Sequence, residues 1–284
     1  MQTCDTATDT AQGIALSPAA LRRSAPEPGP RSFIVEWARC EEDVREAQRL
    51  RFRVFAQEMG ARLSPPPGTP PGMDVDRFDA FCEHLLVRAL DRGEHGRGTV
   101  VGTYRVLPPA QARAAGGYYS DAEFDLSPLA ALRPRALELG RSCVHADWRL
   151  GGVIMGMWTA LGDYMLRHRL DTMIGCASIS LAHGALPAIA LWERLRHRYL
   201  APEPWRVRPL HGIPGAADHA AAGGETAPRG LPDAPPLIKG YLRCGARVLG
   251  PPALDTAFNT ADLPMMLRLA DMAPRYRRHF LASA

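Results

Sequence analysis

Residues 136–147 are mostly small and apolar, yet they carry an acid and a base, Glu138 and Arg141. Burying an ionised side chain costs several kcal/mol, so such groups rarely sit in a core without a partner or a task. In a regular strand these two side chains would point to opposite faces. Gly140 lies between them, and a glycine inside a strand often marks a bulge. One extra residue there would bring both charges to one face, so we predict an acid and a base in a common cleft.

Glu138 is the candidate general base for attack of an amine on a thioester. Desolvation in a partly apolar strand raises the pKa of a carboxyl group, which suits it to accept a proton from the amine, directly or through water. The alternative is a structural ion pair with Arg141 or Arg105, and the pattern alone slightly favours that alternative. Both interpretations stay open at this point.

An acidic loop holds Asp74, Asp76 and Asp79 at close spacing. Such a set can bind a cationic substrate amine, or it can form ion pairs with Arg51 and Arg105. A calcium loop would need the Gly and the terminal Glu of an EF-hand, which are absent here. A solvated turn is the simplest interpretation of a short acidic run.

The segment after the central strand, Arg149-Leu-Gly151-Gly152, lies where a helix is expected to begin. Free backbone N–H groups and the helix dipole at that position favour an anion, such as a phosphate of a pantetheine arm. A mere turn explains two glycines equally well. The histidines lack metal-ligand spacing, so we predict no metal site. The basic and aromatic residues 275–280 suit an acidic carrier protein or anionic lipid, or simply a solvated helix end.

Strands alternate with helices along the chain, which predicts an α/β or α+β layer fold with about six strands. Residues 1–31, rich in Ala, Ser, Thr and Pro, are predicted to be a disordered tail, and residues 32–284 one domain with a loop-like insertion around 201–236. Helical spacing is expected over 41–58, 151–168, 186–199 and 261–280. Strands are expected over 32–40, 83–90, 99–107, 136–147, 171–178 and 237–249.

The net charge of +4 permits an acidic partner or an anionic membrane surface but requires neither. The six cysteines are spread without a CxxC pair, which indicates a reducing, cytoplasmic setting. Residues 172–192 contain no Asp, Glu, Lys or Arg, yet glycines, serines and Pro187 interrupt them, so we expect no membrane span. No nucleic-acid-binding motif is present.

Several motifs in order resemble acyl-homoserine-lactone synthases: Arg51-Phe-Arg-Val-Phe55, Asp76-Arg-Phe-Asp79, Gly102-Thr-Tyr-Arg105 and Glu138-Leu-Gly-Arg141. That resemblance implies a GNAT N-acyltransferase fold and an acyl-carrier-protein donor. It implies that Glu138 is catalytic, and that the remaining members of the cluster bind substrate: Arg51, Phe55, Asp76, Asp79, Arg105 and Arg141. The tryptophan that those synthases carry shortly after the matching phenylalanine is replaced here, near Ala61.

The chain more closely resembles bacterial L-ornithine Nα-acyltransferases, the first enzymes of ornithine-lipid synthesis. These share the same cluster and add motifs that match residues 175–178, 235–243, 255–263 and 275–280. The resemblance implies transfer of a (3-hydroxy)acyl chain from acyl carrier protein to the α-amine of ornithine, with no bound cofactor. It makes the catalytic role of Glu138 the stronger interpretation. The alternatives are a lactone synthase that accepts S-adenosylmethionine, and a non-catalytic module that binds carrier protein or membrane.

Overall fold

The computed structural model describes residues 32–90, 98–149, 152–216 and 234–281 of the 284-residue chain. The predicted tail, residues 1–31, lies outside the described residues, as do Gly151 and residues 217–233 of the predicted insertion. Ser32–Ala284 form one compact unit of the chain.

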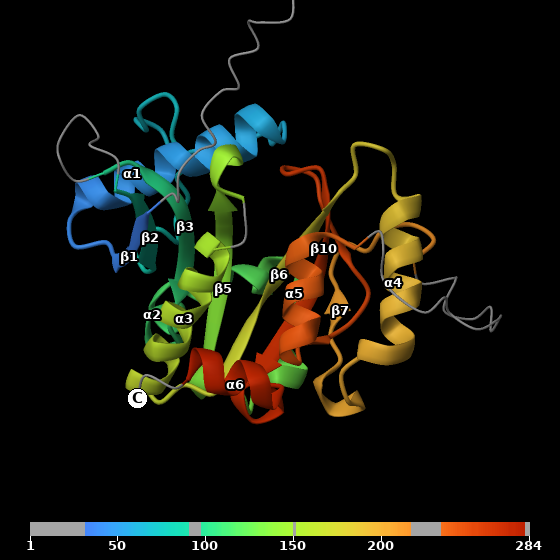
Figure 1. Ribbon diagram of the computed structural model, residues 1–284. Coiled ribbons are helices and arrows are strands. Elements are labelled where there is room, and N and C mark those ends of the chain that lie inside the picture. The colour runs from blue at the N-terminus through green and yellow to red at the C-terminus, as the bar shows by residue number, and fades with distance from the viewer. Residues whose placement is uncertain (1–31, 91–97, 150–151, 217–233, 282–284) are drawn as a thin grey trace, which may run out of the picture. The chain divides into compact units, whose positions relative to one another are not determined.

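Strands and helices follow one another along the chain in the order shown in Figure 1. The strands are β1 Phe33–Trp37, β2 Glu83–Ala89, β3 Val100–Leu107, β4 Phe124–Asp125, β5 Ala136–Val144, β6 Thr172–Ser180, β7 Arg208–Pro209, β8 Arg247–Val248, β9 Ala253–Asp255 and β10 Thr260–Arg268. The α-helices are α1 Glu41–Phe52, α2 Pro109–Ala114, α3 Gly152–Arg167, α4 Leu186–Tyr199, α5 Pro236–Cys244 and α6 Pro274–Phe280. A π-helical turn, Arg53–Glu58, continues α1, and short 3₁₀ turns include Tyr119–Ala122.

One eight-stranded mixed sheet carries the fold, with the strand order β1-β2-β3-β5-β6-β10-β8 and β9 paired to β10. Neighbouring strands are antiparallel except β5 and β6, which run parallel at the middle of the sheet. β4 and β7 form a separate two-stranded ribbon. The predicted α/β layer fold is confirmed, with more strands in the sheet than the six expected.

Helices cover both faces of the first half of the sheet. On α3, Val153, Met157 and Leu161 recur at every fourth residue and pack with Leu85 and Val87 of β2. Leu86, between them, points to the other face and packs with α1, because side chains alternate along a strand. Within the described residues no helix is long and apolar enough to cross a membrane.

The structure differs from the predictions in two C-terminal segments. Residues 237–249, predicted as strand, contain α5, which begins with prolines and ends at Gly245 in the left-handed conformation, φ 112°. Residues 261–280, predicted as helix, contain the strand β10 before α6. β10 is almost wholly buried because its two faces pack in separate apolar clusters, Ala261, Leu263 and Met265 in one and Met266 in the other. A strand that is covered on both faces shows no alternation that a sequence pattern could reveal.

Candidate active site

A bulge in β5 brings Glu138 and Arg141 to one cavity. Across the β3–β5 ladder, Arg105 pairs with Gly140 and Thr103 with Cys143, so Arg141 and Ser142 together face the single residue Tyr104. Arg141 takes the left-handed backbone conformation, φ 49°, at this extra position. The predicted bulge next to Gly140 is confirmed, and both charged side chains line the same cavity.

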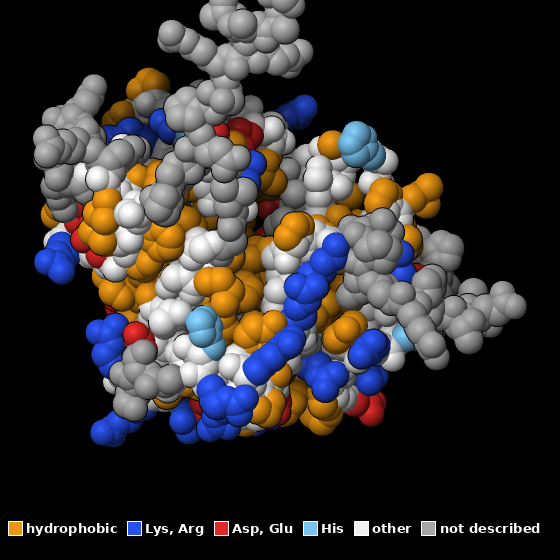
Figure 2. Space-filling view, viewed as in Figure 1, with side chains coloured by type: hydrophobic (Ala, Val, Ile, Leu, Met, Phe, Trp, Pro, Cys, Tyr) orange, Lys and Arg blue, Asp and Glu red, His pale blue; other side chains and the backbone are white. Residues whose placement is uncertain are grey.

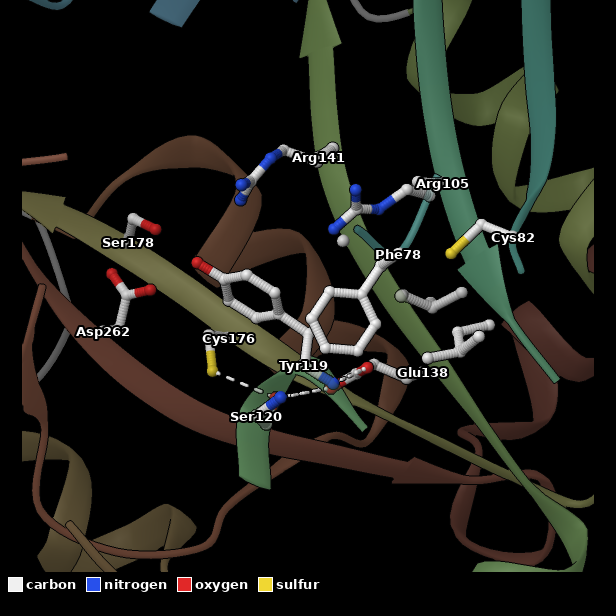
Figure 3. Close-up of a pocket in the computed structure, with 13 residues that line it drawn as sticks. Phe78, Cys82, Arg105, Tyr119, Ser120, Glu138, Arg141, Cys176, Ser178 and Asp262 are labelled. Carbon is white, nitrogen blue, oxygen red and sulfur yellow. Dashed lines mark hydrogen bonds between the residues drawn. The ribbon is translucent and has the colours of Figure 1, made fainter. Parts of the chain in front are cut away.

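The cavity is small and charged, with a volume of about 70 Å³ (Figure 3). Arg105 and Arg141 lie toward one end, with Asp262 and Ser178 on one side of the ring of Tyr119 and Glu138 on the other (Figure 3). The guanidinium carbon of Arg141 is 5.0 Å from the centre of that ring. The lining residues are Phe78, Cys82, Arg105, Leu107, Tyr119, Ser120, Glu138, Leu139, Gly140, Arg141, Cys176, Ser178 and Asp262.

Arg51 anchors the aspartate loop behind this cavity. Its side chain is fully buried; Nε donates to Asp74 Oδ2 at 2.8 Å, and Nη1 and Nη2 donate to the two carboxylate oxygens of Asp79 at 2.8 Å each. Burial alone would raise the pKa of Asp79, but the charges of Arg51 and Arg105 hold it well below its usual range. Arg51 and Asp79 thus brace the loop and line neither of the two cavities described here.

Asp76 connects the same loop to the two arginines of the cavity. Its Oδ1 accepts from Arg105 Nη1 at 2.7 Å and its Oδ2 from Arg141 Nη2 at 3.1 Å. Asp79 Oδ1 accepts a second bond from Arg105, at 3.0 Å. The sequence allowed the acidic loop either to bind a cationic substrate amine or to form ion pairs with arginine. In the structure its aspartates form the ion pairs. The aspartates orient the guanidinium groups that face the cavity.

Glu138 is buried, with 4% of its surface exposed, and its carboxylate accepts three hydrogen bonds. The donors are Tyr119 N at 2.6 Å, Ser120 N at 2.8 Å and Ser120 Oγ at 2.6 Å. Burial raises the pKa of Glu138, and the bonds from Ser120 and Tyr119 oppose that rise. The carboxyl group is therefore held in one orientation at the cavity wall, with a proton affinity above that of an exposed glutamate.

A second, mostly apolar cavity of about 900 Å³ adjoins the charged one. It lies where β5 and β6 part: their parallel ladder extends only from Ala136 paired with Thr172 to Glu138 paired with Ile174. Aromatic side chains such as Trp158 and Tyr241 line it, with their rings stacked 5.3 Å apart. Six residues line both cavities and form their common wall: Leu139, Gly140, Arg141, Cys176, Ser178 and Asp262.

The other predicted site residues lie at the larger cavity or outside it. Phe55 lines it from the π-helical turn and packs edge-on against Phe258, with centroids 5.6 Å apart. Arg149 also lines it and donates from Nε to the carbonyl of Val144 at 2.9 Å. Gly152 opens α3 but lines neither cavity. The phosphate-binding role of Arg149, Gly151 and Gly152 stays a prediction.

Sequence reasoning missed four polar side chains of the charged cavity: Tyr119, Ser120, Ser178 and Asp262. Tyr119 and Ser120 belong to a 3₁₀ turn in a segment that has no periodic pattern. Asp262 lies on β10, opposite Ser178 of β6. A carboxylate in a segment expected to be a helix near the C-terminus gave no reason to place it beside Glu138.

The fold is that of known N-acyl transfer enzymes. Residues 50–159 match the family model described as acetyltransferase (GNAT) domain. Among solved structures, the acyl-homoserine-lactone synthase LasI aligns with a TM-score of 0.51 at 14% identity, over 89% of this chain and 96% of that one. FeeM, an N-acyl amino acid synthase from uncultured soil microbes, aligns with a TM-score of 0.51 at 10% identity, over 88% and 99%. At these identities the likeness shows the fold alone.

Curated relatives are similar over most of the chain. The L-ornithine N(alpha)-acyltransferase of Brucella abortus is 40% identical over 259 residues, which are 89% of this chain and 90% of the relative. The enzyme of the same name from Agrobacterium fabrum is 38% identical over 247 residues, 86% and 83% of the two chains. Together with the GNAT fold and the charged cluster at the β5 bulge, this similarity shows that the chain belongs to the L-ornithine N(alpha)-acyltransferase family.

Proposed function

We propose that the protein transfers an acyl group from a thioester to the α-amine of L-ornithine, giving a lyso-ornithine lipid. One observation carries this proposal: a small charged cavity and a large apolar cavity share a wall at the bulge of β5. An amino acid fits the first in charge, and an acyl chain fits the second in polarity. Their shared wall is where the amine would meet the thioester carbonyl. The names of the relatives support ornithine as the acceptor.

Glu138 serves as the proton acceptor in this mechanism. The ammonium group of ornithine must lose a proton before its nitrogen can attack, and the raised pKa of Glu138 suits that transfer. The C–N bond then forms at the thioester carbonyl and an oxyanion develops on its oxygen. Collapse of this intermediate breaks the C–S bond. The thiolate takes the proton held by Glu138, and the second proton of the attacking nitrogen leaves to solvent as the amide forms.

The arginines at the other end of the cavity orient the acceptor. Arg105 and Arg141 face the cavity and suit the α-carboxylate of ornithine, because a guanidinium group binds carboxylate with two parallel N–H bonds. Arg51, Asp76 and Asp79 hold these two groups in place from behind. Backbone N–H groups of β5 beyond Glu138, where the ladder to β6 has ended, are placed to stabilise the oxyanion.

Acyl carrier protein is the donor that we favour, with its acyl chain in the large cavity near Phe55 and its phosphopantetheine near Arg149, Gly151 and Gly152. A carrier protein is acidic, and Figure 2 shows Lys and Arg side chains gathered over α5 and α6 beside exposed apolar side chains. Arg243 of α5 lines the large cavity. We place the reaction in the cytoplasm, with peripheral contact to an anionic membrane as an option for the same basic surface.

Release of free carrier thiol tests the function. Purified protein, acylated carrier protein and ornithine should release thiol at a rate that depends on ornithine. S-adenosylmethionine in place of ornithine should give none; release with it would support a lactone synthase. Absence of release with every amino acid would support a binding module.

Charge reversal on α6 tests the donor. Changing Arg275, Arg277 and Arg278, which are all exposed, to Glu should raise the KM for acylated carrier protein about 10-fold or more while kcat stays within about two-fold. The same changes at three exposed arginines on other elements, Arg113, Arg198 and Arg208, should have no such effect. An unchanged KM in the α6 variant would remove this surface from carrier binding; lost binding to anionic vesicles alone would assign it to the membrane.

A further inference from the structure

Asp262 and Glu138 are the two carboxylates that line the small cavity, and within the described residues neither forms an ion pair with arginine. Glu138 accepts two backbone N–H bonds, whereas Asp262 accepts from hydroxyl groups. Within the described residues, no Lys, Arg or His nitrogen lies within 4.0 Å of the carboxylates of Asp262 or Glu123, whereas Asp74, Asp76 and Asp79 are all paired with arginine. Asp262 is 5% exposed and accepts hydrogen bonds from two hydroxyl groups, Thr260 Oγ1 at 2.7 Å and Ser178. Among the described residues Arg141 attracts a negative charge on Asp262, but from beyond the 4.0 Å of an ion pair.

Glu123 lies next to Asp262 and adds a second, half-buried carboxyl group. Its Oε2 accepts a bond from Cys176 Sγ at 3.3 Å. One ligand-capable atom from each of Glu123, Cys176 and Asp262 lies within 4.8 Å of the others. Two carboxylates this close repel each other unless they share a proton or a cation. The geometry therefore favours a positive group from a ligand between or beside them.

Of the charges around this carboxyl pair, Asp255 and Glu138 add to that need, whereas Arg141 offsets part of it. The neighbouring titratable groups are Asp255 of β9, Glu138 and Arg141 of β5 and Cys176 of β6. Burial and the charge of Asp262 raise the pKa of Glu123 to about 8, and burial also raises the pKa of Asp262. At neutral pH the empty pair retains a proton, which an incoming ammonium group would displace.

The cavity thus has two poles. Arg105 and Arg141 occupy one end, and Asp262 lies beside the hydroxyl end of the Tyr119 ring (Figure 3). A neutral amino acid would use the arginine end and leave Asp262 unmatched. An amino acid with a second ammonium group on its side chain satisfies both ends.

We infer that Asp262, supported by Glu123, binds the side-chain ammonium group of the acceptor and so makes the enzyme select a basic amino acid over a neutral one. This inference rests on the proposed N-acyl transfer and assigns a specificity role to residues outside the Glu138 cluster. Ornithine and norvaline, which share a five-carbon chain but differ in the δ-amine, are the probes.

Two variants measure the selectivity. The wild-type kcat/KM for ornithine should exceed that for norvaline, and Asp262→Asn should lower the ratio of the two values at least about 10-fold. Glu123→Gln should lower it in the same direction but less. Asp125→Asn removes the same charge from an exposed site two residues from Glu123 and should keep the wild-type ratio. Equal losses with both acceptors in Asp262→Asn would overturn the inference.

A binding measurement on the unaltered protein needs neither turnover nor a variant. Titration calorimetry at pH 7 in buffers of different ionisation enthalpy should show that ornithine releases up to one proton more than norvaline, because its δ-ammonium displaces the proton of the carboxyl pair. Equal proton release, equal affinity for both amino acids, or tight binding of Zn²⁺ with no preference for ornithine would overturn the inference. Preferential binding of ornithine without any acylation would support the inference about Asp262 and contradict only the proposed transfer reaction.

Discussion

Replacing Glu138 with Gln is expected to lower kcat by about 10²–10⁴-fold, the usual range for loss of a general base. The amide has nearly the shape of the carboxyl group, and its oxygen can keep the bonds from Ser120, while Tyr119 N, which donates to the other carboxylate oxygen, loses its acceptor. What disappears is the group that accepts the amine proton. In the wild type the rate should also fall as the pH drops through the raised pKa of Glu138, because its protonated form cannot act as a base.

Single-turnover kinetics with a preformed acyl donor measure this effect apart from product release. The control is Glu203→Gln, an exposed glutamate in another 3₁₀ turn, which should behave as the wild type. The circular dichroism spectrum should match the wild type in both variants, and the melting temperature of Glu138→Gln should fall by no more than the loss of one buried hydrogen bond explains. If Glu138→Gln has a normal kcat at neutral pH, Glu138 is not the proton acceptor and serves only to hold the turn that contains Tyr119.

Replacing Arg51 with Met is expected to destabilise the fold by about 3–5 kcal/mol, the typical cost of removing one partner of a buried ion pair. Asp74 and Asp79 would remain buried with fewer donors, since Arg51 gives each of them hydrogen bonds at 2.8 Å. Methionine fills a similar volume, so loss of charge rather than a cavity causes the effect.

Urea denaturation at neutral pH gives the free energy of unfolding for this comparison. Arg45→Met removes an arginine from the same helix, but one whose ion pairs with Glu41 and Glu42 are exposed, so its effect should be far smaller. Similar stabilities for the Arg51 and Arg45 variants would mean that the buried cluster contributes no more than a surface pair.

Local patterns predicted the part of the site that lies on β5 and the helix after it. Gly140 between two charged residues was enough to suggest a bulge, because parity along a strand is strict. α3 followed from apolar residues at helical spacing. For the acidic loop the sequence left two partners open, a substrate amine or Arg51 and Arg105, and the structure has the ion pairs with these arginines.

The other wall of the cavity could not be predicted because it depends on distant pairing. Ser120 reaches Glu138 from a 3₁₀ turn 18 residues away, and Asp262 arrives on β10 through pairing with Ser178. β10 is buried along nearly its whole length, so its sequence lacks the alternation of apolar and polar residues that would mark a strand. The sequence of α5 carries the signals of a helix start and a helix end, prolines at the start and Gly245 at the end. Its β-branched and aromatic residues nevertheless favoured the prediction of a strand.

The most direct test of the central claim is the position of the acyl group in the product. Purified protein should be supplied with acylated carrier protein and ornithine labelled with ¹⁵N at the α-amine, and the product analysed by tandem mass spectrometry. The account predicts one acyl group, bound through an amide to the labelled nitrogen, with the δ-amine free. An acyl group on the unlabelled δ-nitrogen, or an acyl-homoserine lactone formed only when S-adenosylmethionine is supplied, would contradict it.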